Sequence, residues 1–451
     1  MDASGMVNGF DSAGAASLEP GLRDLVKRRE AVLAPGYRLF YDRPVSFSRA
    51  AGVYLYDDAG QPYLDAYNNV PVVGHCHPRV VAAIAQQAAT LNVHTRYLTT
   101  GVVDYAERLL ASHDQGLDRA MFTCTGSEAN DLALRIARHV TGSSGVIVTA
   151  NAYHGVTAAV AEASPSLGAG VPVGPHIATV PAPDPSLGDD AGAAFADQVA
   201  AAIADLRSRG IGLAAFLADS VLSSDGVLPD PAGLLRPTLD VVHQASGLYI
   251  ADEVQSGFGR TGSHLWGYQR HGLAPDIVTM GKPMGNGLPI AGLVARQPVL
   301  DDFGHKVRYF NTFGGNPVCV AAASAVLDVI EEEGLQANAA ATGTHLLAGL
   351  AEVAAGSSVL SSVRGVGLYF GVDVIDPLSG APSAALAPRI VNGLRDRRVL
   401  ISATGPAGNI LKIRPPLPFN AGHADELLGV LGEVLTSVDS SVGLSMGPSA
   451  G

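Results

Sequence analysis

Short apolar runs alternate with amphipathic stretches through the middle of the chain. The runs with the character of buried strands cover residues 145–150, 213–218, 248–251 and 276–280. Helical periodicity is found over residues 132–140, 197–207 and 237–244. Apolar strands that alternate with helices are typical of a mainly parallel sheet covered on both faces. The pattern therefore predicts an α/β fold that binds its ligands at the carboxyl ends of the strands.

The two ends of the chain have a different pattern. A hairpin is predicted over 53–64, and two more strands are predicted over 367–374 and 410–413. These segments predict a smaller α+β domain that is built from both ends of the chain. The predicted organisation is a mobile tail at 1–20, an N-terminal segment of the small domain at 21–75, a large ligand-binding domain at 76–324 and a C-terminal small domain at 325–451.

Composition and charge narrow the class of protein. Of the 451 residues, 16 % are charged. An average chain has roughly 25 %, so a large core, a buried oligomer interface or both are indicated. The net charge of −13, with no basic run, argues against nucleic acid and anionic membranes as partners. The 13 histidines show no ligand spacing, so no metal is expected. Three scattered cysteines and the lack of a leader-like or membrane-spanning run predict a cytoplasmic protein.

The segment 125–130, TGSEAN, directly precedes a predicted helix. Gly126 and Ser127 at a helix start leave backbone N–H groups free, and the helix dipole adds positive potential, so a phosphate fits there. A plain helix cap at Ser127 explains the same residues. Tyr153 follows the run 145–150, and it either stacks on a planar ligand or belongs to the core.

Two further strand ends carry ionisable side chains. Asp252 directly follows the run 248–251, where a buried carboxylate is costly unless a cationic group meets it. The alternative role for Asp252 is a helix cap. Lys282 follows the run 276–280. A lysine in low-dielectric surroundings has a lowered pKa and forms Schiff bases, and the alternative is an exposed loop lysine.

Together these residues describe a site for pyridoxal phosphate, with a phosphate cradle, a stacking aromatic, a strand-end aspartate and a strand-end lysine in that order. From about Tyr54 to Ala424 the chain resembles the class III, fold type I, pyridoxal-phosphate aminotransferases. The resemblance is closest over ADEVQSGFGRTG and PDIVTMGKPMGNGLP. It implies pyridoxal 5'-phosphate as cofactor. It also implies an α/β fold with a mainly parallel sheet of the seven-stranded type, plus a smaller α+β domain.

The resemblance also implies a role for each matching residue. Lys282 would form the Schiff base and serve as catalytic base, and Asp252 would keep the pyridine nitrogen of the cofactor protonated. The other cofactor contacts would be Gly126 and Ser127 at the phosphate, Tyr153 and Val254 on the two ring faces, Gln255 at the phenolic oxygen and Thr312 at the phosphate of the neighbouring subunit's cofactor. The contact from Thr312 implies a homodimer with shared active sites, and a tetramer stays possible.

Within this family the chain resembles the branch that eliminates phosphate, the ethanolamine-phosphate and 5-phosphohydroxylysine phospho-lyases. The resembling segments are 68–70, GHCHP at 74–78, TRYL at 95–98, 126–142, YFNTFGGNPVCVA and GNILKIRPPL. The chain departs from the phospho-lyase pattern at Asp219 in place of glutamate, at Cys124 in place of asparagine, at Pro71 and Val72 in place of a small residue and a histidine, and at Asp225 within a glycine-rich turn.

Two substitutions bear on the substrate. Transaminases of this class commonly use an arginine for the substrate carboxylate and a glutamate that pairs with this arginine when no carboxylate is present. Here Lys412 occupies the arginine's place and Ser224 the glutamate's. Lysine does not reproduce a bidentate carboxylate clamp, but it serves as a point charge for a substrate phosphate. Asn69 and Arg414 are further candidate substrate contacts, although a strand-surface position also explains Arg414.

The predicted function is that of a PLP-dependent carbon–oxygen lyase. It would eliminate phosphate from ethanolamine phosphate or a close phospho-amine and yield an aldehyde, ammonia and inorganic phosphate. The alternative is a class III aminotransferase that acts on an ω-amine or amino acid with a keto-acid acceptor. A third possibility, a binding protein that has lost catalysis, is disfavoured because Lys282 and Asp252 are both present.

Overall fold

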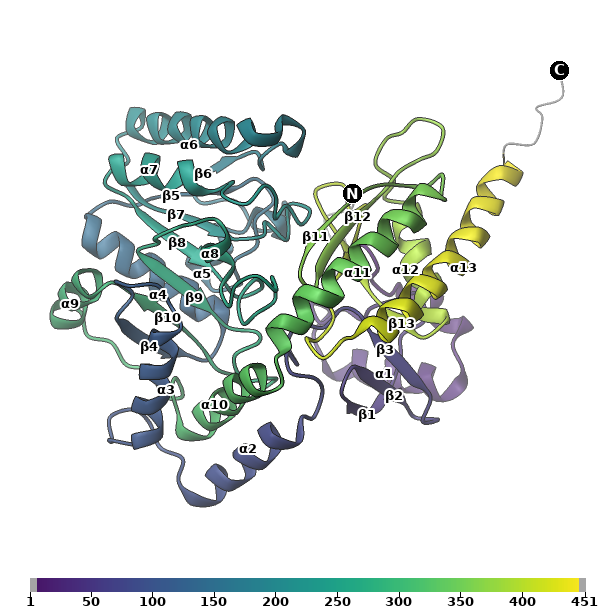
Figure 1. Cartoon of the computed structure of the whole chain (residues 1–451), viewed down its shortest axis with the longest axis horizontal. Helices are drawn as coiled ribbons and strands as arrows, with labels where there is room; N and C mark the ends of the chain where they lie inside the picture. Colours follow the sequence, from purple (N-terminus) through teal and green to yellow (C-terminus); the bar gives the residue numbers. More distant parts are fainter. Residues whose placement is uncertain (1–5, 446–451) are drawn as a thin grey trace.

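A computed structural model describes residues 6–445 of the chain. A seven-stranded sheet with its helices lies at one end of the molecule, and two four-stranded sheets lie at the other end beside the C-terminal helices (Figure 1). This arrangement confirms the predicted α/β sheet with a smaller α+β part.

The seven-stranded sheet is mainly parallel. Its strands, in spatial order, are β4 (Arg119–Thr123), β10 (Ala291–Ala295), β9 (Ile277–Met280), β8 (Leu248–Asp252), β7 (Leu213–Asp219), β5 (Gly145–Thr149) and β6 (Ile177–Val180). The strands from β9 to β6 pair in parallel, whereas β10 is antiparallel to both of its neighbours. Because the parallel strands run in one direction, β5, β7, β8 and β9 end at the same edge of the sheet.

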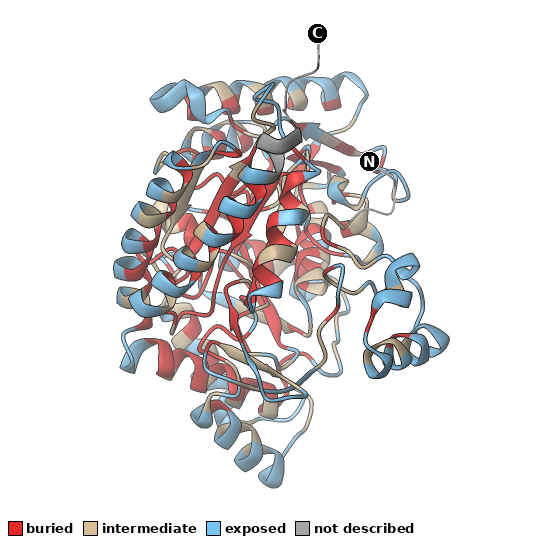
Figure 2. Ribbon diagram, turned by 90° about the vertical axis from the view of Figure 1, so that its right-hand side faces the viewer, coloured by how far each residue is buried: buried red, intermediate tan, exposed pale blue. Residues whose placement is uncertain are grey.

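Alternate residues of these strands enter two different hydrophobic clusters. In β7, Ala215 and Leu217 pack with the side chains of α4 (Gly126–Thr141), whereas Phe216 packs with those of α6 (Ala191–Ser208). This is the period of two that strand geometry imposes, and here both faces of the strand are apolar because helices cover both faces of the sheet. Figure 2 shows the buried strands enclosed by helices whose outer faces are exposed.

The two smaller sheets combine segments from both ends of the chain. One contains β1 (Phe47–Ala51), β2 (Tyr54–Asp57), β3 (Pro62–Asp65) and β13 (Val399–Leu400). The other contains β11 (Leu360–Val366), β12 (Tyr369–Val374), β15 (Ile410–Ile413) and β14 (Ser402–Thr404). The parallel pairing of β13 with β3 joins the C-terminal segment to the N-terminal hairpin. Both ends of the chain thus contribute to the small sheets, as the sequence pattern predicts.

The remaining elements are helices. They are η1 (Ser12–Ser17), α1 (Pro20–Val32), α2 (Pro78–Thr90), α3 (Thr100–Ala111), α5 (Ala158–Ala161), η2 (Pro165–Leu167), η3 (Pro185–Asp190), α7 (Arg236–Gln244), α8 (Gly267–Arg270), α9 (Gln297–Lys306), α10 (Pro317–Glu332), α11 (Leu335–Ala355), α12 (Leu386–Asp396) and α13 (Ala421–Ser445). The long helices α11 and α13 pack against each other beside the small sheets (Figure 1).

The N-terminal segment differs from the mobile tail that its composition predicts for residues 1–20. Residues 1–5 lie outside the described part, but the following residues are held by contacts with the rest of the chain. Asn8 is buried, its side-chain oxygen accepts a hydrogen bond from Ser402 Oγ at 2.9 Å, and its carbonyl accepts one from Tyr41 N at 2.7 Å. Leu18 is also buried. A Gly-, Ala- and Ser-rich composition does not reveal such single anchoring residues.

Candidate active site

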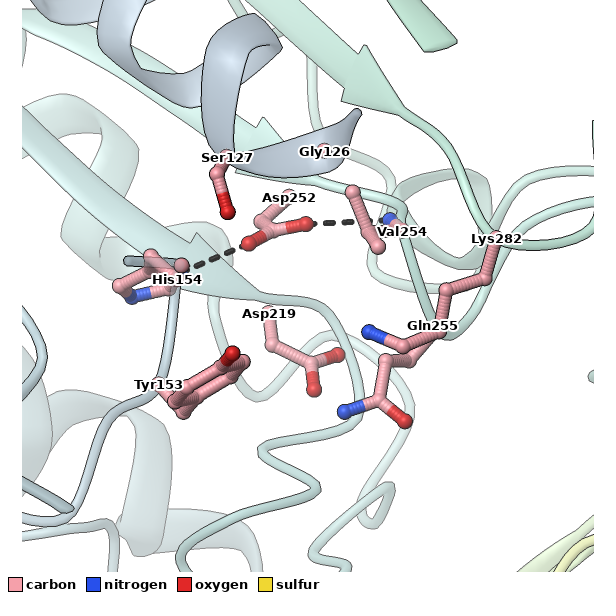
Figure 3. A pocket seen from close by; sticks show the side chains of 10 residues that line it. Gly126, Ser127, Tyr153, His154, Asp219, Asp252, Val254, Gln255 and Lys282 are labelled. Carbon is pink, nitrogen blue, oxygen red and sulfur yellow. Dashed lines mark hydrogen bonds and ion pairs between the residues drawn. The ribbon is translucent and has the colours of Figure 1, made fainter. Parts of the chain in front are cut away.

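A pocket lies where β5, β7, β8 and β9 end, and most of the predicted cofactor residues line it (Figure 3). Its lining residues are Gly126, Ser127, Tyr153, His154, Gly155, Asp219, Asp252, Val254, Gln255 and Lys282. Asp219 and Asp252 are register partners at the ends of β7 and β8, and Thr279 of β9 pairs with Asp252 on the other side. The parallel register therefore brings together side chains that are far apart in the sequence.

The start of α4 leaves two backbone donors available to the pocket. Thr125 is the capping residue, since its side chain accepts from Glu128 N at 3.1 Å and Glu128 reaches back to the Thr125 N–H in a capping box. The N–H groups of Gly126 and Ser127 then have no acceptor within residues 6–445. The cap that the sequence suggests at Ser127 is thus made by Thr125, and the donors of Gly126 and Ser127 remain free for an anion.

Two glycines keep this end of the pocket narrow. A Cβ atom at Gly126 would lie 2.9 Å from Val254 Cγ2, and one at Gly155 would lie 2.4 Å from Ser127 Oγ. Gly155 also has φ +138°, a conformation that side chains disfavour. Gly126 can pack this closely on Val254, and Gly155 on Ser127, only because neither glycine has a side chain.

Asp252 is buried in a closed set of hydrogen bonds. Its Oδ2 accepts from Asn130 Nδ2 at 2.9 Å and lies 2.7 Å from His154 Nδ1, while its Oδ1 accepts from Val254 N at 3.0 Å. Asn130 is held in turn by Thr279 Oγ1, which donates to Asn130 Oδ1 at 2.6 Å. These bonds fix the orientation of the Asp252 side chain.

Sequence reasoning missed His154 and Asn130. His154 Nε2 is buried without a partner among the described residues, whereas Nδ1 carries the proton that it donates to the Asp252 carboxylate. His154 directly follows Tyr153 at the end of a strand, so its position is visible in the sequence. Its contact with Asp252 is not visible in the sequence, because His154 and Asp252 lie 98 positions apart.

Lys282 reaches into the pocket from the side opposite Tyr153 and His154 (Figure 3). Burial, and then the charge of Arg414, lower the pKa of Lys282 from 10.5 to about 8, while Asp252 and Asp219 oppose this shift. A lysine with this pKa is uncharged far more often near neutral pH than an exposed one, and it can act as a nucleophile or base. The alternative of an exposed loop lysine is therefore wrong.

Asp219 contributes a second carboxylate to the pocket. It accepts hydrogen bonds from the backbone N–H groups of Val221 and Ser223, each at 3.0 Å, and from Ser223 Oγ. Burial and the charge of Asp252 raise the pKa of Asp219. The charge of Asp219 opposes the lowering of the pKa at both Lys282 and Lys412, so acidic and basic groups act on one another within a small space.

The two basic residues near the C-terminus lie on the small-sheet side of the pocket. Lys412 is 6 % exposed, and its Nζ lies 5.6 Å from the ring centroid of Tyr369. This Nζ makes no hydrogen bond or ion pair with any described residue, and burial lowers the pKa of Lys412 well below its usual value. Arg414 is also buried rather than on the strand surface, and it donates to Gln255 Oε1.

The other residues singled out in the sequence lie apart from the pocket lining. Thr312 is exposed, in the loop before α10. Asn69 is buried, and its Nδ2 has no partner within the described residues. Ser224 accepts a hydrogen bond from Asn151 through its carbonyl. Arg79 is exposed and ion-pairs with Glu332.

No group of three or more histidine, cysteine, aspartate or glutamate side chains within residues 6–445 is arranged to hold a metal ion. Among the described helices, none has the length and apolar character needed to cross a membrane.

The chain is similar to known proteins over most of its length. The family model described as aminotransferase class III matches residues 40–435. A Drosophila melanogaster protein named alanine–glyoxylate aminotransferase 2-like is 40 % identical, over 94 % of this chain and 89 % of its own length. A Caenorhabditis elegans protein named ethanolamine-phosphate phospho-lyase homolog 1 is 37 % identical, over 97 % of this chain and 98 % of its own.

Among solved structures, a phospholyase from Arthrobacter in complex with phosphoethanolamine is 46 % identical to this chain. It superposes with a TM-score of 0.89 and covers 92 % of this chain and 100 % of its own. A transaminase from the marine bacterium Virgibacillus has a TM-score of 0.84 at 25 % identity, with 93 % of this chain and 100 % of its own covered.

The pocket fits the cofactor of this family. The free N–H groups of Gly126 and Ser127 suit its phosphate, the bonded carboxylate of Asp252 suits its protonated ring nitrogen, and Lys282, whose pKa is lowered, suits its aldehyde. The cofactor is pyridoxal 5'-phosphate, and the chain belongs to the class III aminotransferase family of pyridoxal-phosphate enzymes.

Proposed function

We propose that this protein is a phospho-lyase that releases inorganic phosphate from phosphoethanolamine or a close phospho-amine. The observation that carries the proposal is Lys412, a buried residue whose amino group makes no hydrogen bond or ion pair within the described residues. The solved phospholyase that is bound to phosphoethanolamine supports the same reaction class, since it is 46 % identical to this chain.

A buried lysine without a partner is best explained by an anionic ligand. Removing an amine from water is costly unless a ligand compensates for it, and a phosphate dianion would favour the charged form of Lys412. Lysine at this position lacks the planar fork with which arginine binds a carboxylate in two bonds. Ser224, which has no charge, stands where such transaminases have the glutamate that pairs with this arginine. The side chains therefore favour a phosphate over an α-carboxylate.

The cofactor contacts proposed for this chain follow the pocket lining. Gly126 and Ser127 bind the cofactor phosphate through their N–H groups, and Asp252 faces the ring nitrogen. Tyr153 and Val254 contact the two ring faces, which places the flat ring between them. When bound, the cofactor acts as an electron sink for the carbon that bears the substrate nitrogen.

The residues of this chain then carry out the proton and phosphate steps. Lys282 removes a proton from the carbon that bears the nitrogen, for which its pKa of about 8 is suited. Lys412 holds the substrate phosphate. The bond between the adjacent carbon and the phosphate oxygen breaks, and phosphate leaves with the electron pair. Tautomerisation and hydrolysis of the remaining enamine yield an aldehyde and ammonia.

The exposed loop around Thr312 supports a homodimer with shared sites as part of the proposal. Phe313 is 69 % exposed, and Leu98 is 98 % exposed. Such apolar exposure is explained when a second copy of the chain covers it. Thr312 then contacts the cofactor phosphate of the neighbouring subunit.

An aminotransferase is the second candidate, because the 40 % identical Drosophila relative carries an aminotransferase name. Incubation of the holoenzyme with phosphoethanolamine and no keto acid separates the two candidates. The lyase releases phosphate and ammonia in equal amounts over many turnovers. An aminotransferase instead stops after the cofactor is converted to its amine form, without phosphate release, and that outcome would refute the proposal.

A further inference from the structure

Gln255 joins the two sides of the pocket through three hydrogen bonds. Its Nε2 donates to Ser223 Oγ at 3.0 Å, on the segment that follows β7. Its Oε1 accepts from Tyr369 Oη at 3.2 Å and from a guanidinium nitrogen of Arg414. Tyr369 begins β12 and Arg414 follows β15, so this amide on the large-sheet side is held by two residues of the small sheet.

The identity of these partners determines which way the amide faces. Arginine has donors and no acceptor, so the atom of Gln255 that faces Arg414 must be the carbonyl oxygen Oε1. The nitrogen Nε2 therefore lies on the side of Ser223 and Asp219, as Figure 3 shows for Asp219. Only one of its two hydrogens is used by Ser223, and the second is available to a ligand in the pocket.

Arg414 is itself held in place. It is 7 % exposed, its guanidinium carbon lies 4.6 Å from the ring centroid of Tyr67, and its backbone N–H donates to Ala66 O at 2.9 Å. A guanidinium that is packed on an aromatic ring and bonded to an amide is suited to orient that amide. Lys412, two residues earlier in the chain, has no such bond within the described residues.

We propose that Arg414 is a positioning residue that acts through Gln255. It fixes the carbonyl of Gln255 on the small-sheet side and thereby presents Nε2 as a donor to the phenolic oxygen of the cofactor. The role rests on the proposed contact between Gln255 and that oxygen, and it is independent of whether the enzyme eliminates phosphate or transfers amino groups. This role differs from that of Lys412, which is proposed to contact the substrate.

The test is a pH titration of the visible absorption of the bound cofactor in four holoenzymes: wild type, Arg414→Met, Gln255→Leu and the double variant. A donor to the phenolic oxygen stabilises its deprotonated form, so its loss moves the midpoint to higher pH. We expect a shift of roughly one pH unit in each single variant, the size of one net hydrogen bond. The double variant should titrate like Gln255→Leu alone.

The double variant separates this role from a simple charge effect. If Arg414 acts on the cofactor through its charge, removing it in the Gln255→Leu background shifts the midpoint again, and the proposal is overturned. If Gln255→Leu leaves the midpoint unmoved, the contact of Gln255 is refuted and the role of Arg414 with it. If Arg414→Met raises only the KM for phosphoethanolamine, Arg414 is a substrate contact, which also overturns the proposal.

Two further variants guard against effects on folding. Tyr369→Phe removes the other donor to Gln255 Oε1, and it should shift the midpoint in the same direction by a smaller amount. Arg395 is a matched control, because it is also buried and its guanidinium donates to Pro44 O at 3.1 Å, away from the pocket. Arg395→Met should lower stability without moving the midpoint. A shift of equal size in Arg395→Met would contradict the proposal.

Discussion

Asp252 and Lys412 are both ionisable and both buried, yet their surroundings differ. Asp252 receives hydrogen bonds from Asn130, His154 and Val254, whereas the amino group of Lys412 has no polar partner within the described chain. A buried charge with a full set of bonds is a fixed part of the protein. A buried amine without them costs stability until a ligand arrives. We propose that the Asp252 side of the pocket holds the cofactor and that the Lys412 side receives the substrate.

The largest effect is expected at Lys282, whose pKa is affected by burial, by Arg414 from one side of the pocket and by Asp252 from the other. Lys282→Ala should lower kcat for phosphate release by about 10⁴-fold or more, because the general base and nucleophile are lost together. Lys282→Arg should be equally inactive, since arginine does not lose its proton. Activity of the arginine variant near the wild-type level would show that another group removes the proton.

Asp252→Asn should have the next largest effect, and it tests the side of the pocket on which Asp252 accepts its three hydrogen bonds. The variant keeps the shape of the side chain but loses the charge, and we expect about a 10³-fold lower kcat. Phosphate release and amino transfer should fall together, because both depend on the cofactor ring. The measurement is kcat for phosphoethanolamine, together with the rate at which a plain amine bleaches the cofactor absorption. A loss confined to one of the two reactions would contradict the division between the two sides.

Lys412→Met tests the other side and should be selective. We expect kcat/KM for phosphoethanolamine to fall about 100-fold, the value of one lost charge-assisted hydrogen bond. The rate with an unphosphorylated amine should change little. Lys306→Met is the matched control, because Lys306 is an exposed lysine that pairs with Asp302. Equal losses for both substrates in the Lys412 variant would remove the basis for the substrate assignment.

The smallest expected effect is on the free energy of unfolding. Its sign differs between variants of Lys412 and of Asp252. In the substrate-free holoenzyme, Lys412→Met should raise the free energy of unfolding by about 1–3 kcal/mol, because an unpaired polar group is no longer buried. Asp252→Asn should lower it, because its donors lose a charged acceptor. Denaturant titrations of the three proteins at neutral pH measure both changes.

The pH dependence of this stability follows from the lowered pKa of Lys412. The unfolded chain binds a proton at this residue up to the usual lysine value near 10.5, while the folded chain releases it at lower pH. The unfolded state thus holds more protons in that interval, and the free energy of unfolding rises with pH. Lys412→Met should reduce this rise. An unchanged slope in the variant would show that Lys412 is charged in the folded protein.

Much of the site follows from the sequence because parallel strands end together. Asp252 and Lys282 directly follow apolar runs, so their meeting in one pocket was predictable from strand direction alone. The start of α4 was predictable from its residue types, although Thr125 rather than Ser127 makes the cap.

Other features depend on contacts between distant segments. Asn130 and His154 meet Asp252 through hydrogen bonds that span 122 and 98 positions, and nothing local in the sequence signals them. For Arg414 a signal did exist. Lys412 and Arg414 are two residues apart along an extended segment, which puts both side chains on one face. What the local pattern leaves open is that this face meets the pocket, because that depends on how the small sheet packs on the large one.

The most direct test of the account is whether Lys412 binds a phosphate group by itself. Ethyl phosphate carries this group and has no amine to react with the cofactor, so calorimetric titration of the holoenzyme isolates the contact. We expect wild type and Lys306→Met to bind ethyl phosphate with proton uptake, and Lys412→Met to lose both the binding and the uptake. Equal affinity of Lys412→Met and wild type would contradict it.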